Sequence, residues 1–288
     1  MAKLKDLARP IVMGLTPPAF MQPARKFWRL VNGLGWDNFY GAWPRLADVP
    51  VTKETDDTDP WSQTIAARWR ENLVADATPI CDDTGQLILP LLASRFSGPL
   101  TVLDFGGGPG VGLANIRQFA RLDLSRLLYV LVETPAMCGT VRNEIEAHGG
   151  KVVEKIRDAL PRPLIVNASS SLQYISDYRA VLCNLARLTP EIFIVSQTPV
   201  SDCLTYARQI LNTPHKKMAT WVFNRMEFAA DMRSLGYRPI FSVDHDLPLT
   251  HGRAPGPSVM ASMVFVPARP RPIQVTRRPR STPSEFIR

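Results

Sequence analysis

The sequence of 288 residues predicts an α/β fold, in which helices cover both faces of a mostly parallel, seven-stranded sheet. Short apolar segments alternate with helix-like segments from Leu100 onward, as in folds that carry a parallel sheet. A glycine-rich turn follows the first of these segments. The mean hydropathy of −0.06 and the 21% of charged residues are typical of a globular chain, and exclude collagen-like and wholly disordered classes.

Residues 1–98 are expected to form an N-terminal cap that is irregular at first and then helical. Asp59-Pro60 predicts a helix start, because Asp is a good N-cap and Pro suits the first helical position. Apolar side chains then recur every four residues, at Trp61, Ile65, Trp69 and Leu73. A second helix is expected from about Asp83.

Residues 99–267 are expected to form the main domain, with seven strands. The strand candidates are Leu100–Phe105, Leu127–Val132, Lys151–Val153, Leu164–Val166, Glu191–Ser196, Ile240–Val243 and Met260–Val266. Helical patterns follow the first, second and fourth of these segments, and the third of these helices is marked by Tyr174, Tyr178, Val181, Leu182, Leu185 and Leu188. A further helix capped by Asn224 runs to Leu235 before Gly236 ends it. No helix separates the last two strands, so they are predicted to pair antiparallel.

The segment Asp104-Phe105-Gly106-Gly107-Gly108-Pro109-Gly110 is the strongest functional signal in the chain. Glycines at alternating positions let the backbone pass close under a ligand, because no Cβ stands in the way. The turn lies at the carboxyl end of a predicted central strand, where open α/β sheets bind ligands. Glu133 ends the next strand, where a carboxylate can accept hydrogen bonds from two ribose hydroxyls.

Two cofactor classes suit this arrangement, the nicotinamide dinucleotides and S-adenosylmethionine. The dinucleotide fingerprint requires a small residue where this chain has Val111 or Leu113. Asp104 would also repel a pyrophosphate, whereas it would attract a cationic sulfonium or ammonium group. The sequence therefore favours S-adenosylmethionine. An NAD(P)-dependent oxidoreductase and a non-catalytic binding protein on the same fold are the alternatives.

The glycine-rich segment resembles the first motif of class I S-adenosylmethionine-dependent methyltransferases, and Glu133 resembles the acidic residue that follows their second strand. Residues 164–174 stand where those enzymes carry their fourth-strand motif, and the closing strand pair resembles their reversed final strand. Together with the Trp- and Gly-rich N-terminal segment, the chain is most similar to a bacterial branch of that superfamily. The resemblance implies a Rossmann-like domain and a methyltransferase activity.

The resemblance also implies roles for individual residues. The candidate cofactor-binding residues are Asp104, Phe105, Gly106, Gly108, Gly110, Glu133, Thr134, Asp158, Asn167, Ala168 and Ser169. Asp104 and the glycines would hold the methionine part, Glu133 the ribose and Asp158 the adenine. Residues 167–169 would form the floor beside the methyl group. Asn167 departs from the many relatives with an acidic residue at this position, and an amide cannot neutralise a positive amine.

The acceptor is expected to be a small molecule or a glycan- or lipid-linked group, methylated on oxygen. A hydroxyl acceptor needs a base, and Tyr174 and His215 are the candidates. No metal is expected, because Asp244, His245, Asp246 and His251 have metal-binding residue types without a recognised spacing.

The net charge of +8 is concentrated at the two ends of the chain. Residues 1–45 carry +5, the tail 268–288 carries +5, and the remainder sums to −2. A near-neutral core disfavours a nucleic-acid partner, whereas basic ends favour attraction to an anionic membrane surface. The tail is expected to be disordered. Four cysteines without zinc or disulfide spacing, and the absence of a long apolar run or signal peptide, predict a cytoplasmic, membrane-peripheral protein.

Overall fold

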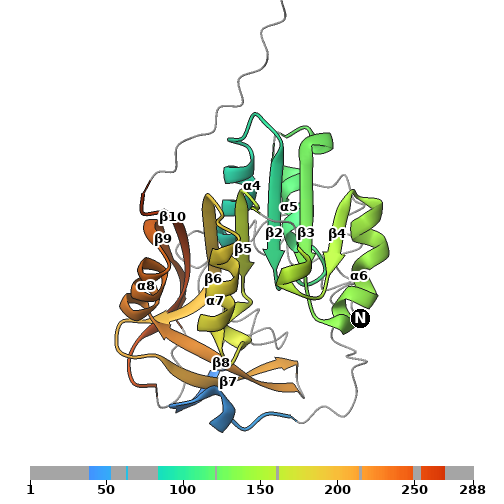
Figure 1. Cartoon of the computed structure of the whole chain (residues 1–288). Helices are drawn as coiled ribbons and strands as arrows, with labels where there is room; N and C mark the ends of the chain where they lie inside the picture. Colours follow the sequence, from blue (N-terminus) through green and yellow to red (C-terminus); the bar gives the residue numbers. More distant parts are fainter. Residues whose placement is uncertain are drawn as a thin grey trace, which may run out of the picture.

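The computed structural model describes residues 39–52, 63, 84–120, 122–159, 162–213, 216–248 and 254–269. One β-sheet forms the centre of this part of the chain, and helices cover both of its faces (Figure 1). The helix predicted from Asp59 lies outside the described residues, apart from Gln63, and so does the tail after Arg269. Both therefore stay predictions.

Seven strands form the predicted sheet. Five run parallel in the spatial order β4 (Gly150–Val153), β3 (Leu127–Val132), β2 (Leu100–Phe105), β5 (Ile165–Ser169) and β6 (Ile192–Ser201). Next to β6 lies the antiparallel β10 (Ser258–Pro267), and β9 (Tyr237–Pro248) pairs antiparallel with β10. The prediction of a mostly parallel seven-stranded sheet with a reversed last strand is confirmed.

The helices divide between two apolar cores, one on each face of the sheet. One core receives α4 (Ile88–Ala93), α5 (Val111–Phe119) and α6 (Pro135–Ala147), and the other receives α7 (Tyr178–Arg187) and α8 (Arg225–Ser234). Short 3-10 turns connect these elements at η1 (Leu46–Asp48), η2 (Thr84–Leu87), η3 (Leu124–Arg126), η4 (Ile156–Asp158) and η5 (Leu172–Tyr174). The sheet is thus doubly wound, which leaves its carboxyl edge free for a ligand.

Local capping signals decide where the helices begin. Asn224 caps α8, since its side chain accepts a hydrogen bond of 2.8 Å from the backbone N–H of Glu227, as predicted. Asp177 caps α7 in the same way, through the N–H of Ala180. The sequence pattern placed Tyr174 on this helix, but the structure places Tyr174 in η5, because the cap at Asp177 starts α7 three residues later.

Three further strands extend the sheet beyond the prediction. β7 (Tyr206–Thr213) and β8 (Lys216–Asn224) form an antiparallel hairpin, and β8 pairs parallel with the end of β6. β1 (Phe39–Trp43) pairs with β7, although the sequence analysis expected this segment to be irregular. The hairpin lies beyond the carboxyl ends of the central strands and packs against η5 (Figure 1).

The buried side chain of Arg208 explains why residues 39–43 become a strand. Its guanidinium donates hydrogen bonds to the backbone carbonyls of Phe39 and Gly41, at 2.7 and 3.1 Å, and lies over the Phe39 ring. Burial lowers the pKa of Arg208. These partners are more than 160 residues apart, so no local pattern could have predicted this strand.

Candidate functional site

The glycine-rich turn between β2 and α5 has a backbone that only glycine adopts readily. Gly106, Gly108 and Gly110 have φ values of +64°, +58° and +88°. A Cβ on Gly106 would come within 2.5 Å of the Ser171 Cβ, whereas a Cβ on Gly108 would meet nothing within 4 Å. The turn is therefore closely packed at its start and open at Gly108. We call residues 106–110 the glycine loop.

Glu133, at the end of β3, holds the glycine loop by hydrogen bonds. Its Oε1 accepts from the N–H of Gly108 at 2.9 Å, and its Oε2 accepts from the N–H of Thr134 at 2.7 Å. Burial raises the pKa of Glu133, and these two backbone donors partly offset that rise. Each carboxylate oxygen has two lone pairs, so each can accept one more hydrogen bond from a ligand. Thr134 also caps α6, through the N–H of Met137.

Asp104 lies fully buried beneath the glycine loop. Its carboxylate accepts hydrogen bonds from the Tyr129 hydroxyl and, at 2.8 Å, from Nδ2 of Asn167. Burial raises the pKa of Asp104, and both hydrogen bonds partly oppose that rise. A Cβ on Gly107 or Gly112 would lie within 2.5 Å of Asp104 Oδ2. Asp104 and Asn167 thus support the glycine loop from below. The predicted contact of Asp104 with the methionine part of the cofactor, and the predicted place of Asn167 in the floor beside the methyl group, stay predictions.

The segment after β5 presents two buried polar atoms that no described residue satisfies. Ser171 and Gln173 are only 7% and 1% exposed, yet Ser171 Oγ and Gln173 Oε1 have no hydrogen-bond partner among the described residues. The amide nitrogen of Gln173 is used, since it donates to Ser170 Oγ at 3.1 Å. Buried polar atoms are nearly always satisfied, so these two atoms are exceptions, and Ser171 lies beside the start of the glycine loop.

Two residues close to Ser171 and Gln173 have a strained backbone. Ser170 and Gln197 have φ values of +50° and +51°, which a residue with a side chain adopts at a cost of about 1–3 kcal/mol. Ser170 follows β5, and Gln197 lies in β6, where the pairing with β10 shifts register. Strained residues of this kind cluster at ligand sites. Both lie toward the carboxyl ends of neighbouring strands, close to the segment that carries Ser171.

The remaining predicted residues are distributed around this edge of the sheet. Phe105 is half-buried against the core under α7, Ala168 is buried in β5, and Ser169 ends that strand half-buried. Asp158 lies in η4 after β4 and is exposed beside Arg157. Tyr174 is 38% exposed in η5. His215 lies outside the described residues, so its role stays a prediction.

Sequence reasoning did not select Ser171 or Gln173 as site residues. The run Ser169-Ser170-Ser171 after a buried strand was the available signal, because three consecutive hydroxyl residues have no structural need to follow a strand end. Only the packing of Ser171 on Gly106 shows that one of these hydroxyls adjoins the glycine loop.

The acidic and histidine residues of β9 make other contacts. Asp244 accepts two hydrogen bonds from Arg225, at 2.8 and 2.9 Å, and Nε2 of His245 lies 2.8 Å from Ser262 Oγ. Within the part of the chain that the structure describes, no group of three metal-binding side chains comes together. None of the described helices has the length and apolar character that crossing a bilayer requires.

The fold and the site define an α/β protein with a glycine-rich ligand loop and an acidic residue at adjacent strand ends. Neither a family model nor a curated protein matches the sequence. A solved S-adenosylmethionine-dependent methyltransferase from Clostridium acetobutylicum is similar, with 10% identity and a TM-score of 0.46 over 72% of this chain and 98% of that one.

Two further solved structures are similar at the same level. The magnesium protoporphyrin IX methyltransferase from Synechocystis has 14% identity and a TM-score of 0.46, over 74% of this chain and 100% of that one. The CcbJ methyltransferase from Streptomyces caelestis has 15% identity and a TM-score of 0.47, again over 74% and 100%. Likenesses this distant carry no conclusion about activity, which has to come from the chain's own residues.

Proposed function

We propose that this chain is an S-adenosylmethionine-dependent methyltransferase that binds its cofactor between the glycine loop and Glu133. One observation carries the proposal: the Glu133 carboxylate is held by the N–H of Gly108, at the part of the loop where a Cβ would meet nothing. A carboxylate fixed in this way can accept both hydroxyls of a ribose.

The surrounding residues support a positively charged nucleoside rather than a dinucleotide. Asp104 and Glu133 place two carboxyl groups at the glycine loop, where they disfavour a pyrophosphate by charge repulsion. The unsatisfied Ser171 Oγ lies beside Gly106 at the start of the same loop, and the unsatisfied Gln173 Oε1 lies two residues further along the same segment. An ammonium or hydroxyl group of a ligand would supply the missing donors.

In this proposal each part of the site has one task. S-adenosylmethionine supplies a methyl group that is already activated on a sulfonium. The glycine loop and Glu133 bind the nucleoside, Thr134 and Asp158 adjoin the base, and residues 168–171 line the side where the acceptor enters. The contribution of the protein is to orient the acceptor and exclude water, since the reacting methyl group needs no further activation.

The proposed reaction is O-methylation of a small-molecule or glycan- or lipid-linked acceptor. Although part of the Tyr174 side chain is exposed, desolvation at its hydroxyl raises the pKa above the ordinary value of 10, so the hydroxyl remains protonated near neutral pH and suits hydrogen bonding to an acceptor better than proton removal. His215 remains the candidate base. The basic ends at 1–45 and 268–288 would draw the chain to an anionic surface that carries such an acceptor.

Mass spectrometry of the purified chain tests the cofactor directly, because tightly bound S-adenosylhomocysteine would co-purify. Calorimetric titration with S-adenosylhomocysteine and with NADH gives the comparison. Binding of S-adenosylhomocysteine alone supports the proposal. Binding of NADH without S-adenosylhomocysteine would show that the glycine loop serves an oxidoreductase instead.

A further inference from the structure

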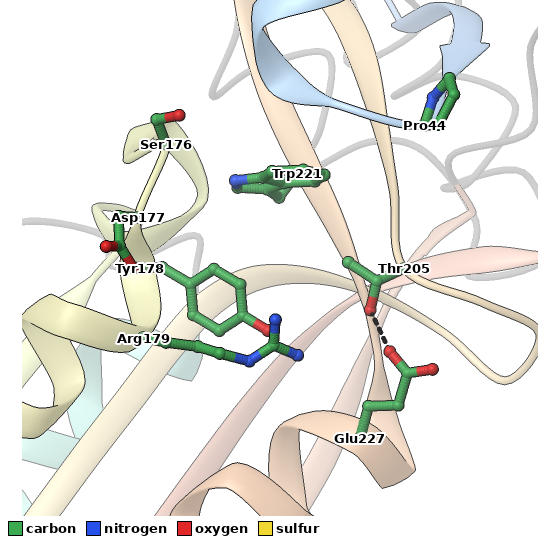
Figure 2. A pocket seen from close by; sticks show the side chains of 8 residues that line it. All are labelled: Pro44, Ser176, Asp177, Tyr178, Arg179, Thr205, Trp221 and Glu227. Atoms are coloured by element: carbon green, nitrogen blue, oxygen red, sulfur yellow. Dashed lines mark hydrogen bonds between the residues drawn. The ribbon is translucent and has the colours of Figure 1, made fainter.

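A cavity of about 270 Å³ lies between the start of α7 and the β7–β8 hairpin, apart from the glycine loop. Figure 2 shows the indole of Trp221 over the open space, with Tyr178 and Arg179 on one side and Thr205 and Glu227 on the other. The indole is fixed, because its N–H donates a hydrogen bond of 3.0 Å to the carbonyl of Ile175.

The charged side chains that line the cavity are also held in place. Glu227 Oε2 accepts a hydrogen bond of 2.7 Å from Thr205, and Asp177 Oδ1 caps α7 at 3.0 Å. Arg179 lies 4.9 Å from the centre of the Tyr178 ring and donates through Nε to Asp231 at 2.9 Å. Each side chain is anchored by one part and has a second polar part for a ligand, namely Glu227 Oε1, Asp177 Oδ2 and the terminal nitrogens of Arg179.

The lining offers both hydrogen-bond acceptors and hydrogen-bond donors, which suits a ligand with several hydroxyls. Asp177 and Glu227 repel an anion, and the positive charge of Arg179 is paired with Asp231 through Nε. A neutral ligand with several hydroxyls can both donate to the carboxylates and accept from the guanidinium. The flat face of Trp221 provides apolar area for the C–H groups of such a ligand. The volume is below the roughly 300–1,000 Å³ of sites for drug-sized ligands, which suits a single ring.

The cavity and the glycine loop lie at the two ends of the 3-10 turn η5. Ser171, at the start of η5, packs on Gly106, and Ser176, just beyond η5, lines the cavity. Four residues of chain lie between them, so their Cα atoms are at most about 18 Å apart. The 3-10 turn η5 between them shortens that distance, because such a turn rises only about 2 Å per residue. Tyr174 lies on this connecting turn.

We propose that this cavity binds a neutral polyhydroxylated ring, such as one sugar unit, and that it is the acceptor-binding site of the chain. The binding of the ring stands on the cavity alone, whereas its role as methyl acceptor rests on the proposed function. Glu227 and Asp177 accept hydrogen bonds from ring hydroxyls, Arg179 donates to them, and Trp221 packs on the ring face.

Saturation-transfer NMR on the full chain tests the binding. The probes are the methyl glycosides of glucose, galactose, mannose and rhamnose, with ethanolamine as a cationic probe and glycerol phosphate as an anionic one. Glu227→Gln removes the charge and keeps an oxygen that can accept from Thr205, so the variant should fold. It should weaken glycoside binding about fivefold, because a hydrogen bond to a charged carboxylate is replaced by a weaker one to a neutral amide oxygen. Glu191→Gln, an exposed residue next to the start of β6 at the opposite edge of the sheet, is the matched control.

Glycoside binding by the wild type that falls in Glu227→Gln and not in Glu191→Gln supports the proposal. The proposal is overturned if none of the glycosides binds, if ethanolamine or glycerol phosphate binds more tightly than all of them, or if both variants bind like the wild type. Titration of the same proteins with S-adenosylhomocysteine separates the two proposals. A wild type that binds a glycoside without S-adenosylhomocysteine overturns the proposed function and leaves the sugar site standing.

Discussion

Gly108 donates its backbone N–H to Oε1 of Glu133 across 2.9 Å, although the two residues are 25 positions apart in the chain. The hydrogen bond joins the turn after β2 to the end of β3, the next strand of the sheet. The hydrogen bond therefore holds the Glu133 carboxylate and the open part of the glycine loop in a fixed position relative to each other.

Replacement of Glu133 by Ala should weaken the binding of S-adenosylhomocysteine by about tenfold or more, because two hydrogen bonds from the ribose to a charged group are lost. The free energy of unfolding should change little, since burial already disfavours the ionised carboxylate. Calorimetric titration and urea unfolding measure the two effects. Glu154→Ala, an exposed residue just after β4, is the control. An unchanged affinity in Glu133→Ala would refute the ribose assignment.

Gly108→Ala and Gly149→Ala form a matched pair. Both glycines have a positive φ, +58° and +80°, and a Cβ would meet nothing within 4 Å at either position. Each substitution should thus lower the free energy of unfolding by about 1–2 kcal/mol through backbone strain. Only Gly108→Ala should also reduce the affinity for S-adenosylhomocysteine, because its methyl group would occupy ligand space. Equal affinities in the two variants would contradict a ligand at Gly108.

Asp104→Ala should lower the free energy of unfolding by about 2–4 kcal/mol, as measured by urea denaturation. The substitution leaves the buried Tyr129 hydroxyl and Asn167 amide without their acceptor. Asp158→Ala, at an exposed carboxylate, should change stability by less than about 0.5 kcal/mol. If both variants are as stable as the wild type, Asp104 does not support the loop.

As the pH falls, cofactor binding should begin to weaken at a higher pH than it would if Glu133 had the ordinary pKa of a glutamate. Burial raises the pKa of Glu133 above its ordinary value of 4.5, so the carboxylate takes up a proton earlier as the pH falls. A protonated Glu133 has lost one acceptor and its charge, and the affinity should fall with that protonation. Calorimetric titrations of the wild type and Glu133→Gln over a pH series check this, and the Gln variant should lack this step.

The raised pKa of Glu133 also determines how the free energy of unfolding changes with pH. Because the folded-state pKa of Glu133 is raised, the folded form favours the protonated group. This contribution to the free energy of unfolding is present below pH 4.5 and is lost as the pH rises through the folded-state pKa. The melting temperature of ligand-free Glu133→Gln, relative to the wild type, should therefore rise between acid and neutral pH. A difference that is constant with pH would contradict the raised pKa.

Local signals in the sequence were sufficient for most of the sheet and its helices. The seven predicted strands are all present, and the predicted cap at Asn224 makes the hydrogen bond that starts α8. The glycine loop was recognisable because its positive φ values require glycine wherever they occur. Each of these features depends on residues close together in the chain, and for that reason a linear pattern predicted them.

The doubly wound sheet, the glycine loop and the acidic residue at the end of the next strand could all be predicted from local sequence patterns. The three-dimensional arrangement was needed to show that Asp104 is enclosed by Tyr129 and Asn167, and that Phe39–Trp43 joins the sheet through Arg208. It also decided that Trp221 and Glu227 line a cavity with the start of α7. These arrangements join segments that lie far apart in the chain, and a contact between distant segments leaves no periodicity or spacing for a sequence to display.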